Sequence, residues 1–352
     1  MAKTHHIIGC DGTWQRDDQE VPTNVKRLID AADEQKSADG TLQRVMHFDG
    51  VGANGSWLTR LYNGATGADL HQRVKEAYAY ICQNYQDGDD LTLIGFSRGS
   101  YTARSLNGMI YKCGLLDFSK VSNPEKAIED AYKFYKSDVK PSTPEAINWR
   151  ATHAHGYRPF VSLACFDTVG ALGIPRRFPL AGLFNRGKQF HDVTLNRYTR
   201  TALHAVSIDE RRAPYMVTPM EISDHAETLL MQRYFVGDHA GIGGGAAQTG
   251  LLAEKAQHWM MRYMHLYMNV GFHPASYPDE EGETYMDVSP QEFAYRRNLV
   301  NILGGGQDER KVKSFTDLHA QSVAPYWQKR EDDYRPTNLH RFTDRLKSWL
   351  PL

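Results

Sequence analysis

One serine of this chain lies in a sequence pattern that suits nucleophilic chemistry. Residues Gly95-Phe96-Ser97-Arg98-Gly99 fit G-x-S-x-G, with a compact apolar run before the serine and helix-forming residues after it. In a tight turn from strand to helix, the glycines allow close packing and the serine Oγ stands at the positive end of the helix dipole. We predict that Ser97 is a nucleophile; the alternative is a serine that only caps the helix.

A serine nucleophile needs a base and an acid that orients the base, and with this motif the chain order is serine, acid, histidine. Asp167 directly follows the apolar run 161–166 and precedes a turn. His239 follows an apolar run that ends at Val236, and it precedes a glycine-rich stretch that would let an imidazole approach the serine. We therefore predict Asp167 as the acid and His239 as the base.

The chain holds 15 histidines, so position must separate the base from the others. His153 and His155 precede Asp167, which is the wrong order for this motif. We predict a helix from Val193 to Val206; His204 lies in it and His191 just before it, and both would be packed or solvated. These four histidines are weaker candidates than His239.

The oxyanion that forms during acyl transfer needs backbone N–H donors. We predict the first donor at Arg98, directly after the nucleophile. The second is expected in the loop after the first strand, at Gly12 or Thr13. Asp11 could fix that loop or be an ordinary turn residue, and Asp238 could support the histidine from the other side.

Strands that alternate with helices must position these side chains. Compact apolar runs predict strands at residues 6–10, 43–48, 91–96, 160–166 and 229–236. Apolar spacing predicts helices after Thr23, over 70–85, after Ser97, at 124–136 and over 251–268. This alternation predicts an α/β fold of the α/β-hydrolase type, a mostly parallel sheet with helices on both faces. In such sheets the chemistry lies at the carboxyl ends of the strands, where the candidate residues fall.

The order of elements predicts one catalytic domain over residues 1–270. The polar region from about 117 to 156 could form a lid insertion over the site, and residues 172–188, with several Pro and Gly, predict a long loop. Residues 271–352 are polar and irregular, with short helices expected near 290–303 and 339–349. We predict that this C-terminal extension packs on the same domain.

The motifs of this chain occur together, and in the same order, in a known family. Between residues 5 and about 265 they are Asp11-Gly12-Thr13-Trp14, Gly50-Val51-Gly52, Gly95-Phe96-Ser97-Arg98-Gly99 with Ala103-Arg104, Phe166-Asp167-Thr168-Val169-Gly170, Ser207-Ile208-Asp209-Glu210-Arg211-Arg212, and Gly237-Asp238-His239 before Gly243-Gly244-Gly245. With this series the chain resembles the DUF2235 family, the catalytic domain of type VI secretion lipase effectors of the Tle1 class.

The resemblance implies an α/β-hydrolase whose triad is Ser97, Asp167 and His239, with phospholipase A-like activity through an acyl-enzyme. It implies a lipid or other acyl-ester substrate and, for a toxin, an immunity protein and a secretion-system partner. The chain departs from the family at one position. Members commonly have an aspartate two residues after the histidine, where this chain has Gly241.

Composition limits the other function classes. A net charge of −1 gives no field that would attract nucleic acid, so we expect no nucleic-acid partner. No apolar run is long enough to span a bilayer and no signal-peptide pattern occurs, so we expect no transmembrane segment and a cytoplasmic location in the producing cell, with delivery to a target cell if the chain is an effector. The four cysteines form no CxxC pair and predict buried free thiols.

Three further interpretations remain open. An esterase acting on a soluble substrate would use the same triad. A dinucleotide-binding protein would instead use Gly241-x-Gly243-x-x-Ala246, which fits G-x-G-x-x-A, although its strand comes late in the chain. The third interpretation is a non-catalytic hydrolase fold that serves only as an interaction module. We expect no cofactor and no metal, and a cation held by Asp11, Asp49 and Asp238 would require their loops to converge.

Overall fold

A parallel β-sheet forms the centre of the molecule. We describe residues 3–12, 21–50, 68–170, 194–212, 215–224, 226–276, 310–329 and 334–349 of a computed structural model. The sheet has six strands in the order β2-β1-β3-β4-β6-β8, and every neighbouring pair is parallel. These strands are β1 (Thr4–Cys10), β2 (Leu42–Phe48), β3 (Asp90–Phe96), β4 (Val161–Phe166), β6 (Thr199–Ser207) and β8 (Leu229–Phe235). The predicted α/β fold with a parallel sheet is confirmed.

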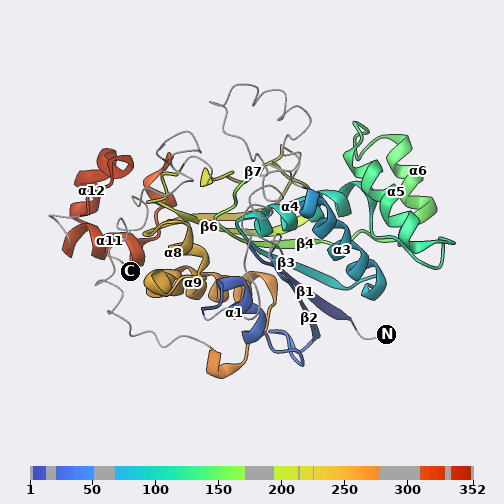
Figure 1. Cartoon of the computed structure of the whole chain (residues 1–352), viewed down its shortest axis with the longest axis horizontal. Helices are drawn as coiled ribbons and strands as arrows, with labels where there is room; N and C mark the ends of the chain where they lie inside the picture. The colour runs from blue at the N-terminus through green and yellow to red at the C-terminus, as the bar shows by residue number, and fades with distance from the viewer. Residues whose placement is uncertain are drawn as a thin grey trace.

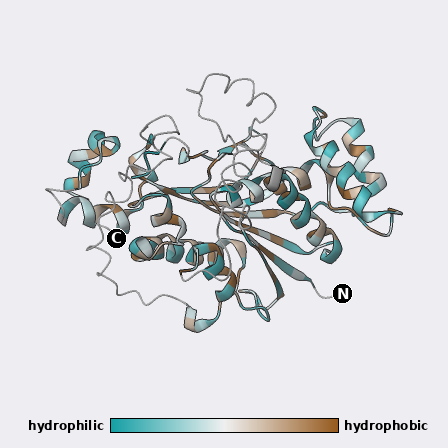
Figure 2. Cartoon of the chain, viewed as in Figure 1, coloured by the Kyte–Doolittle hydropathy of each residue, from teal (hydrophilic) through white to brown (hydrophobic). Residues whose placement is uncertain are grey.

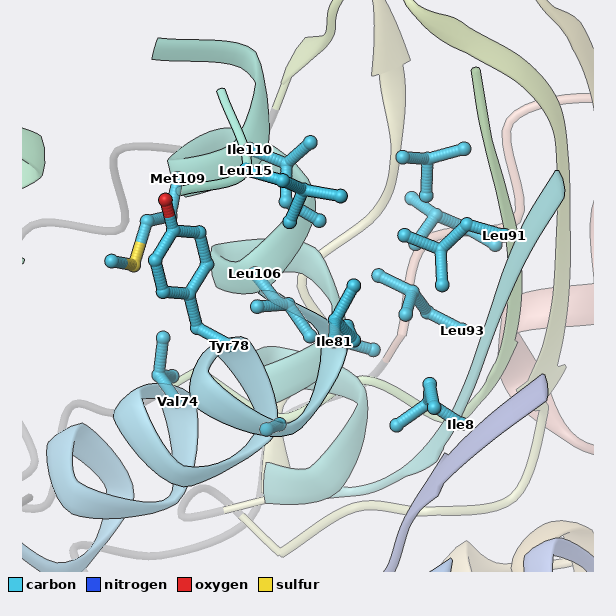
Figure 3. Packing of buried hydrophobic residues seen from close by; sticks show 14 of the residues in the cluster. Ile8, Val74, Tyr78, Ile81, Leu91, Leu93, Leu106, Met109, Ile110 and Leu115 are labelled. Atoms are coloured by element: carbon cyan, nitrogen blue, oxygen red, sulfur yellow. The ribbon is translucent and has the colours of Figure 1, made fainter. Parts of the chain in front are cut away.

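Helices cover both faces of this sheet (Figure 1). The main ones are α1 (Asn24–Ala31), α3 (Ala68–Asn84), α4 (Arg98–Cys113) and α9 (Gly250–Met268). On one face Ile8 and Leu93 pack with residues of α3 and α4 (Figure 3). On the other face Ile7 and Ile94 pack with residues of α1 and α9. Because successive strand residues point to opposite faces, strands covered on both sides, such as β3 and β4, are largely apolar. Figure 2 shows apolar segments, in brown, beside hydrophilic ones along the strands of the sheet.

The carboxyl ends of the strands meet at one edge of the sheet. Cys10 pairs with Gly95, and Phe96 pairs with Phe166, so the residues after β1, β3 and β4 emerge side by side. Ser207 pairs with Phe235, which brings the ends of β6 and β8 to the same edge. The candidate residues therefore come together because of strand register.

The helix predicted from Val193 to Val206 is wrong. These residues form β5 (Thr194–Leu195) and most of β6, and β5 pairs with β7 (Glu221–Ile222) in a small separate sheet. The run Thr199–Ser207 is rich in β-branched residues and alanine and is buried along nearly its whole length. A strand buried on both faces has no polar alternation, so its apolar spacing resembles that of a buried helix.

The polar region 117–156 does not cover Ser97 in this structure. It forms α5 (Pro124–Lys136), whose bounds match the prediction, and a second helix that the sequence did not indicate, α6 (Pro144–His153). The His155 Nδ1 lies 3.5 Å from an Asp87 oxygen, in the turn before β3. This region thus packs at the amino-terminal edge of the sheet, opposite the nucleophile (Figure 1).

The C-terminal segment, by which we mean the described residues 310–329 and 334–349, packs against the β6–β8 side of the sheet. It contains η5 (Phe315–Asp317), α11 (Ala320–Lys329), η6 (Thr337–Phe342) and α12 (Thr343–Lys347). Its buried side chains, among them Val323, Trp327 and Leu339, share one cluster with Val206 and Tyr234 of the sheet. Helices near 339–349 agree with the prediction, and those expected near 290–303 lie outside the described residues. Among the described helices, none has the length and apolarity to cross a bilayer.

Candidate active site

Ser97 lies in a strained turn between β3 and α4. Its backbone has φ 57° and ψ −120°, a conformation that non-glycine residues rarely adopt. The Ser97 N–H donates to the Phe166 carbonyl at 3.0 Å, and the Val169 N–H donates to the Ser97 carbonyl at 3.4 Å. The turn is therefore fixed against the end of β4, with the serine at the N-terminus of a 16-residue helix whose dipole favours negative charge.

The two glycines of the motif are required by close backbone approach. A Cβ at Gly99 would lie 2.0 Å from the Cys10 carbonyl oxygen, because α4 starts directly against the end of β1. A Cβ at Gly95 would lie 2.5 Å from the Ser100 Cα, inside the turn itself. These contacts give the physical reason why the motif predicts a tight strand-to-helix turn.

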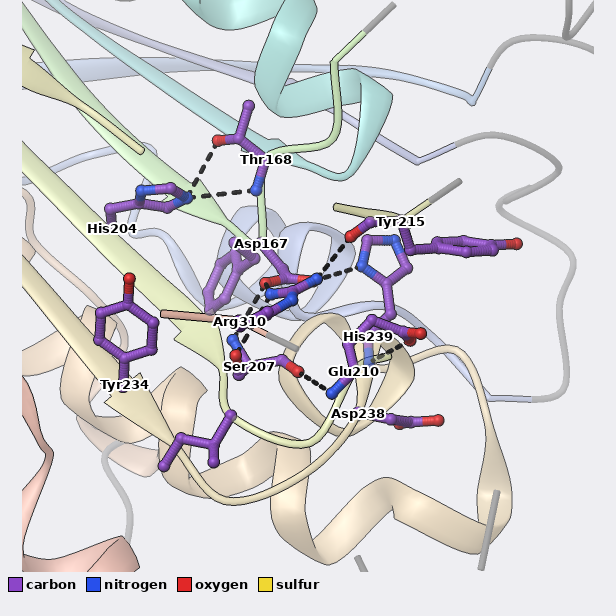
Figure 4. A network of polar contacts seen from close by, with 12 residues as sticks. Asp167, Thr168, His204, Ser207, Glu210, Tyr215, Tyr234, Asp238, His239 and Arg310 are labelled. Carbon is purple, nitrogen blue, oxygen red and sulfur yellow. Dashed lines mark hydrogen bonds and ion pairs between the residues drawn. The ribbon is translucent and has the colours of Figure 1, made fainter. Parts of the chain in front are cut away.

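Asp167 and His239 are in direct contact (Figure 4). The His239 Nδ1–H donates to Asp167 Oδ2 at 2.6 Å, and both side chains are buried. Burial raises the pKa of the Asp167 carboxyl, but the charge of Arg310 and the bond from His239 outweigh it and hold that pKa well below its usual range. An ionised carboxylate can only accept, so Nδ1 carries the proton and Nε2 is left as the basic atom.

The imidazole is held over the residue that precedes Ser97. The ring of His239 lies 4.7 Å from the ring of Phe96, centroid to centroid, and 4.9 Å from that of Tyr215. His239 starts the short helix α8 (His239–Gly243), and a Cβ at Gly243 would lie 2.0 Å from the Phe96 ring. Glycine at 243 thus lets α8 pack on Phe96 and bring His239 toward the turn that carries the serine.

Sequence reasoning missed Arg310, which binds Asp167 from the C-terminal segment. The Arg310 Nη2 donates to Asp167 Oδ2 at 2.9 Å and its Nη1 donates to Oδ1, and the guanidinium is fully buried. The same group donates to the carbonyls of Ser207, at 3.2 Å, and Tyr215, at 2.6 Å. Nothing in the sequence marked this arginine, because it lies in a polar region 143 residues after its partner.

A second ion pair supports the backbone of His239. Glu210 is fully buried and accepts the His239 N–H at 3.3 Å. Its Oε1 accepts from the Arg212 Nε at 2.8 Å, and the Arg212 guanidinium lies over the Tyr215 ring at 4.2 Å. The resemblance included Glu210 and Arg212 in a motif without giving them a role, and the structure now shows their contacts.

Asp238 caps α8 and does not contact the imidazole of His239. Its Oδ1 accepts the Gly241 N–H at 2.9 Å, and burial followed by the charge of Glu210 raises the pKa of its carboxyl. A Cβ at Gly241 would make ordinary contacts, at 3.4 Å or more, so glycine is not required there by space. Gly241 and Gly243 lie within α8 and not in a turn that precedes a helix, which argues against the dinucleotide interpretation.

Asp11 organises the loop after β1. Its Oδ1 accepts the N–H of Gly12 at 2.8 Å, and its Oδ2 accepts the Thr23 hydroxyl at 2.7 Å and lies 3.2 Å from the His47 Nε2. The Gly12 N–H is therefore already engaged by the Asp11 carboxylate in this structure. The other candidate, Thr13, lies outside the described residues. Arg98 is the first residue of α4, as predicted.

The other histidine candidates that the structure describes do not hydrogen-bond to Asp167. His204 is fully buried in β6, where its Nε2 receives the Thr168 N–H at 3.2 Å and burial lowers its pKa to about 3. His153 and His155 lie with α6 at the opposite edge of the sheet. His191 lies outside the described residues. The four cysteines are buried and free, as predicted.

Comparison with known proteins gives one family. The model described as "T6SS, Phospholipase effector Tle1-like, catalytic domain" matches residues 4–263. The uncharacterised protein YEL023C of Saccharomyces cerevisiae is 25% identical over 241 residues, which are 61% of this chain and 33% of that protein.

Two solved structures are also similar. An uncharacterised protein from Pseudomonas aeruginosa has 16% identity and a TM-score of 0.41, over 79% of this chain and 48% of its own. The Tle1 effector bound to the VgrG spike of the type 6 secretion system has 16% identity and a TM-score of 0.38, over 69% of this chain and 51% of its own. The match to the yeast protein YEL023C covers only about a third of that protein's length. Because the family match covers well over half of its residues, the chain belongs to the family of Tle1-like catalytic domains of type VI secretion phospholipase effectors.

Proposed function

We propose that this chain is a serine hydrolase that cleaves an acyl ester of a phospholipid, with Ser97 as nucleophile, His239 as base and Asp167 as orienting acid. The observation that carries the proposal is the buried 2.6 Å contact between His239 and Asp167, beside the strained turn of Ser97. A nucleophile, a base and an acid in serial arrangement are the parts that acyl transfer needs. Family membership supports the lipid class of substrate.

The proposed reaction has two halves. In the first, Ser97 Oγ attacks the ester carbonyl carbon while its proton passes to His239 Nε2, and the C–O bond to the alcohol then breaks as His239 returns the proton to the leaving alcohol. In the second, a water molecule loses a proton to His239 and attacks the acyl-enzyme, which releases a fatty acid and restores the serine. Asp167 stays ionised throughout and stabilises the imidazolium.

Oxyanion stabilisation is proposed for the N–H of Arg98, at the start of α4. The helix dipole adds to this effect because its positive end lies at Ser97. Since Gly12 donates to Asp11, we propose that a second donor comes from Thr13. Removal of one such donor typically lowers kcat by about 10²–10³-fold.

The family description also concerns secretion. Delivery into a target cell, a secretion-system partner and an immunity protein are proposals that rest on membership of an effector family alone.

Labelling with a fluorophosphonate tests the nucleophile without knowledge of the substrate. The purified chain should react covalently, and peptide mass spectrometry should locate the adduct on Ser97. A matched control is Ser100→Ala, one helical turn along, where the serine hydroxyl donates to the Phe166 carbonyl at 3.0 Å. Labelling that persists in Ser97→Ala, or an adduct on another residue, would refute the assignment.

The substrate class is tested in parallel with phosphatidylcholine in mixed micelles and with a short p-nitrophenyl ester. Release of fatty acid and lysophospholipid by the purified enzyme is the expected result. Turnover of the short ester alone would keep the nucleophile and move the substrate to a soluble acyl ester.

A further inference from the structure

The buried charge around the Asp167–His239 pair must be balanced. With a neutral imidazole the pair carries one negative charge, and its carboxylate is fully buried. An isolated buried carboxylate takes up a proton because desolvation penalises its charged form. A protonated Asp167 would lose its role as a pure acceptor, and the His239 tautomer would no longer be fixed.

Arg310 supplies the balancing charge. Among the described residues, other ionisable groups near this pair include Glu210, Arg212, Asp238, Tyr215, His204 and Tyr234. Glu210 is neutralised by Arg212, His204 stays neutral because burial lowers its pKa to about 3, and burial raises the pKa of Tyr234. Arg310 is thus the fully buried cation that contacts Asp167 within the described part of the chain.

The geometry of Arg310 also fixes orientation. Both Asp167 oxygens accept from the same guanidinium, and Oδ1 accepts the Ser207 N–H at 3.0 Å as well. This leaves the remaining direction of Oδ2 for the His239 Nδ1. A planar guanidinium can hold a carboxylate by two parallel bonds, whereas an ammonium is a point charge that fixes no plane.

We infer that Arg310 is a positioning residue of the catalytic unit, and that this unit extends beyond the family's catalytic domain into the C-terminal segment. The matched family region ends at residue 263, so a chain cut at that boundary would lack the cation that balances Asp167. The Asn338 side chain donates to the carbonyls of Ile208, at 3.0 Å, and Arg310, at 3.2 Å, and so ties the segment to the loop after β6. The inference rests on the proposed serine hydrolase activity.

The test is the pH profile of kcat/KM for the full chain, Arg310→Lys, Arg310→Met and a matched control, Arg335→Met. Arg335 belongs to the same segment but donates to the carbonyls of Trp327 and Tyr334, away from the site. In Arg310→Met we expect kcat to fall on the order of 100-fold through misplacement of the base. We also expect the acid limb of the kcat/KM profile to shift to higher pH by about one unit or more, because Asp167 takes up a proton at higher pH once the arginine charge is gone.

Arg310→Lys separates charge from orientation. It keeps the positive charge, so its acid limb should stay at the wild-type pH, while kcat should fall about 10-fold because the two parallel bonds are lost. KM should change less than twofold in both Arg310 variants, since the arginine is fully buried and does not face substrate.

Two results would overturn the inference. One is an Arg310→Met enzyme whose loss of activity and pH profile equal those of Arg335→Met, which is the behaviour of a merely structural residue. The other, which applies even if Arg310→Met does not fold, is an Arg310→Lys enzyme with full activity. Lack of turnover and of fluorophosphonate labelling in the wild-type chain would instead count against the proposed function.

Discussion

Replacement of Asp167 by asparagine probes the centre of the polar network. The carboxylate accepts four bonds, and an asparagine can keep acceptors at only one of its two positions. With its oxygen at the Oδ1 position it still accepts from Ser207 and from Arg310. Its NH₂ group then faces His239 Nδ1 and favours the tautomer with the proton on Nε2, which cannot act as the base.

The expected loss of activity follows from this tautomer. In an enzyme with the same triad logic the equivalent change lowers kcat about 10⁴-fold, and we expect a loss of that order. The free energy of unfolding should also fall, by about 3–5 kcal/mol, because Arg310 becomes a buried charge without a counter-ion. At roughly 2–4 °C per kcal/mol, the Tm should fall by about 10 °C.

The same variant should change the dependence of stability on pH. The pKa of Asp167 is held well below its usual range in the folded state, so its contribution is present above the unfolded pKa of about 4 and is lost as pH falls below that value. Thermal unfolding from pH 7 to pH 3 should therefore show a smaller fall in Tm for Asp167→Asn than for the wild type. A kcat within tenfold of wild type, or an unchanged Tm at pH 7, would refute the reasoning.

Three further changes test other parts of the structure. Gly99→Ala places a Cβ 2.0 Å from the Cys10 carbonyl oxygen and should lower the free energy of unfolding by more than about 3 kcal/mol, as measured by thermal unfolding. Gly250→Ala, where no atom lies within 4 Å of the added Cβ, should not lower it. Burial raises the pKa of Asp209 to about 7, so the stability that this group contributes at low pH is lost as pH rises from about 4 to 7, and Asp209→Asn should raise the Tm at pH 8 but not at pH 4. Asp11→Ala removes the acceptor of the Gly12 N–H and should lower kcat roughly 10-fold with little change in KM, as measured by steady-state turnover.

Much of the site could be predicted because its parts are local. The motif around Ser97 needs two glycines for contacts within one strand–turn–helix unit, and those contacts are present. Asp167 follows the buried strand β4 and His239 follows the end of β8, and parallel register brings such positions to one edge without further information. The bounds of α5 could be predicted because Asn123 caps it and Pro124 starts it.

The rest depends on long-range packing. The strand β6 is buried on both faces and carries no polar alternation, so its pattern does not distinguish it from a helix. Arg310 is buried because the C-terminal segment packs on β6 and β8, and no local sequence feature predicts that burial. The bond from Gly12 to Asp11 depends on the fold of the loop after β1, and it engages one of the two N–H groups that the sequence pattern favours as an oxyanion donor.

The most direct test of the central claim is turnover of phosphatidylcholine by the wild-type chain and by Ser97→Ala, in the same mixed micelles and at equal folded concentration. We expect the wild type to release fatty acid and the variant to lose at least about 10³-fold in turnover, because without the Ser97 hydroxyl no nucleophile remains to form the acyl-enzyme. Unchanged turnover in Ser97→Ala would contradict the account.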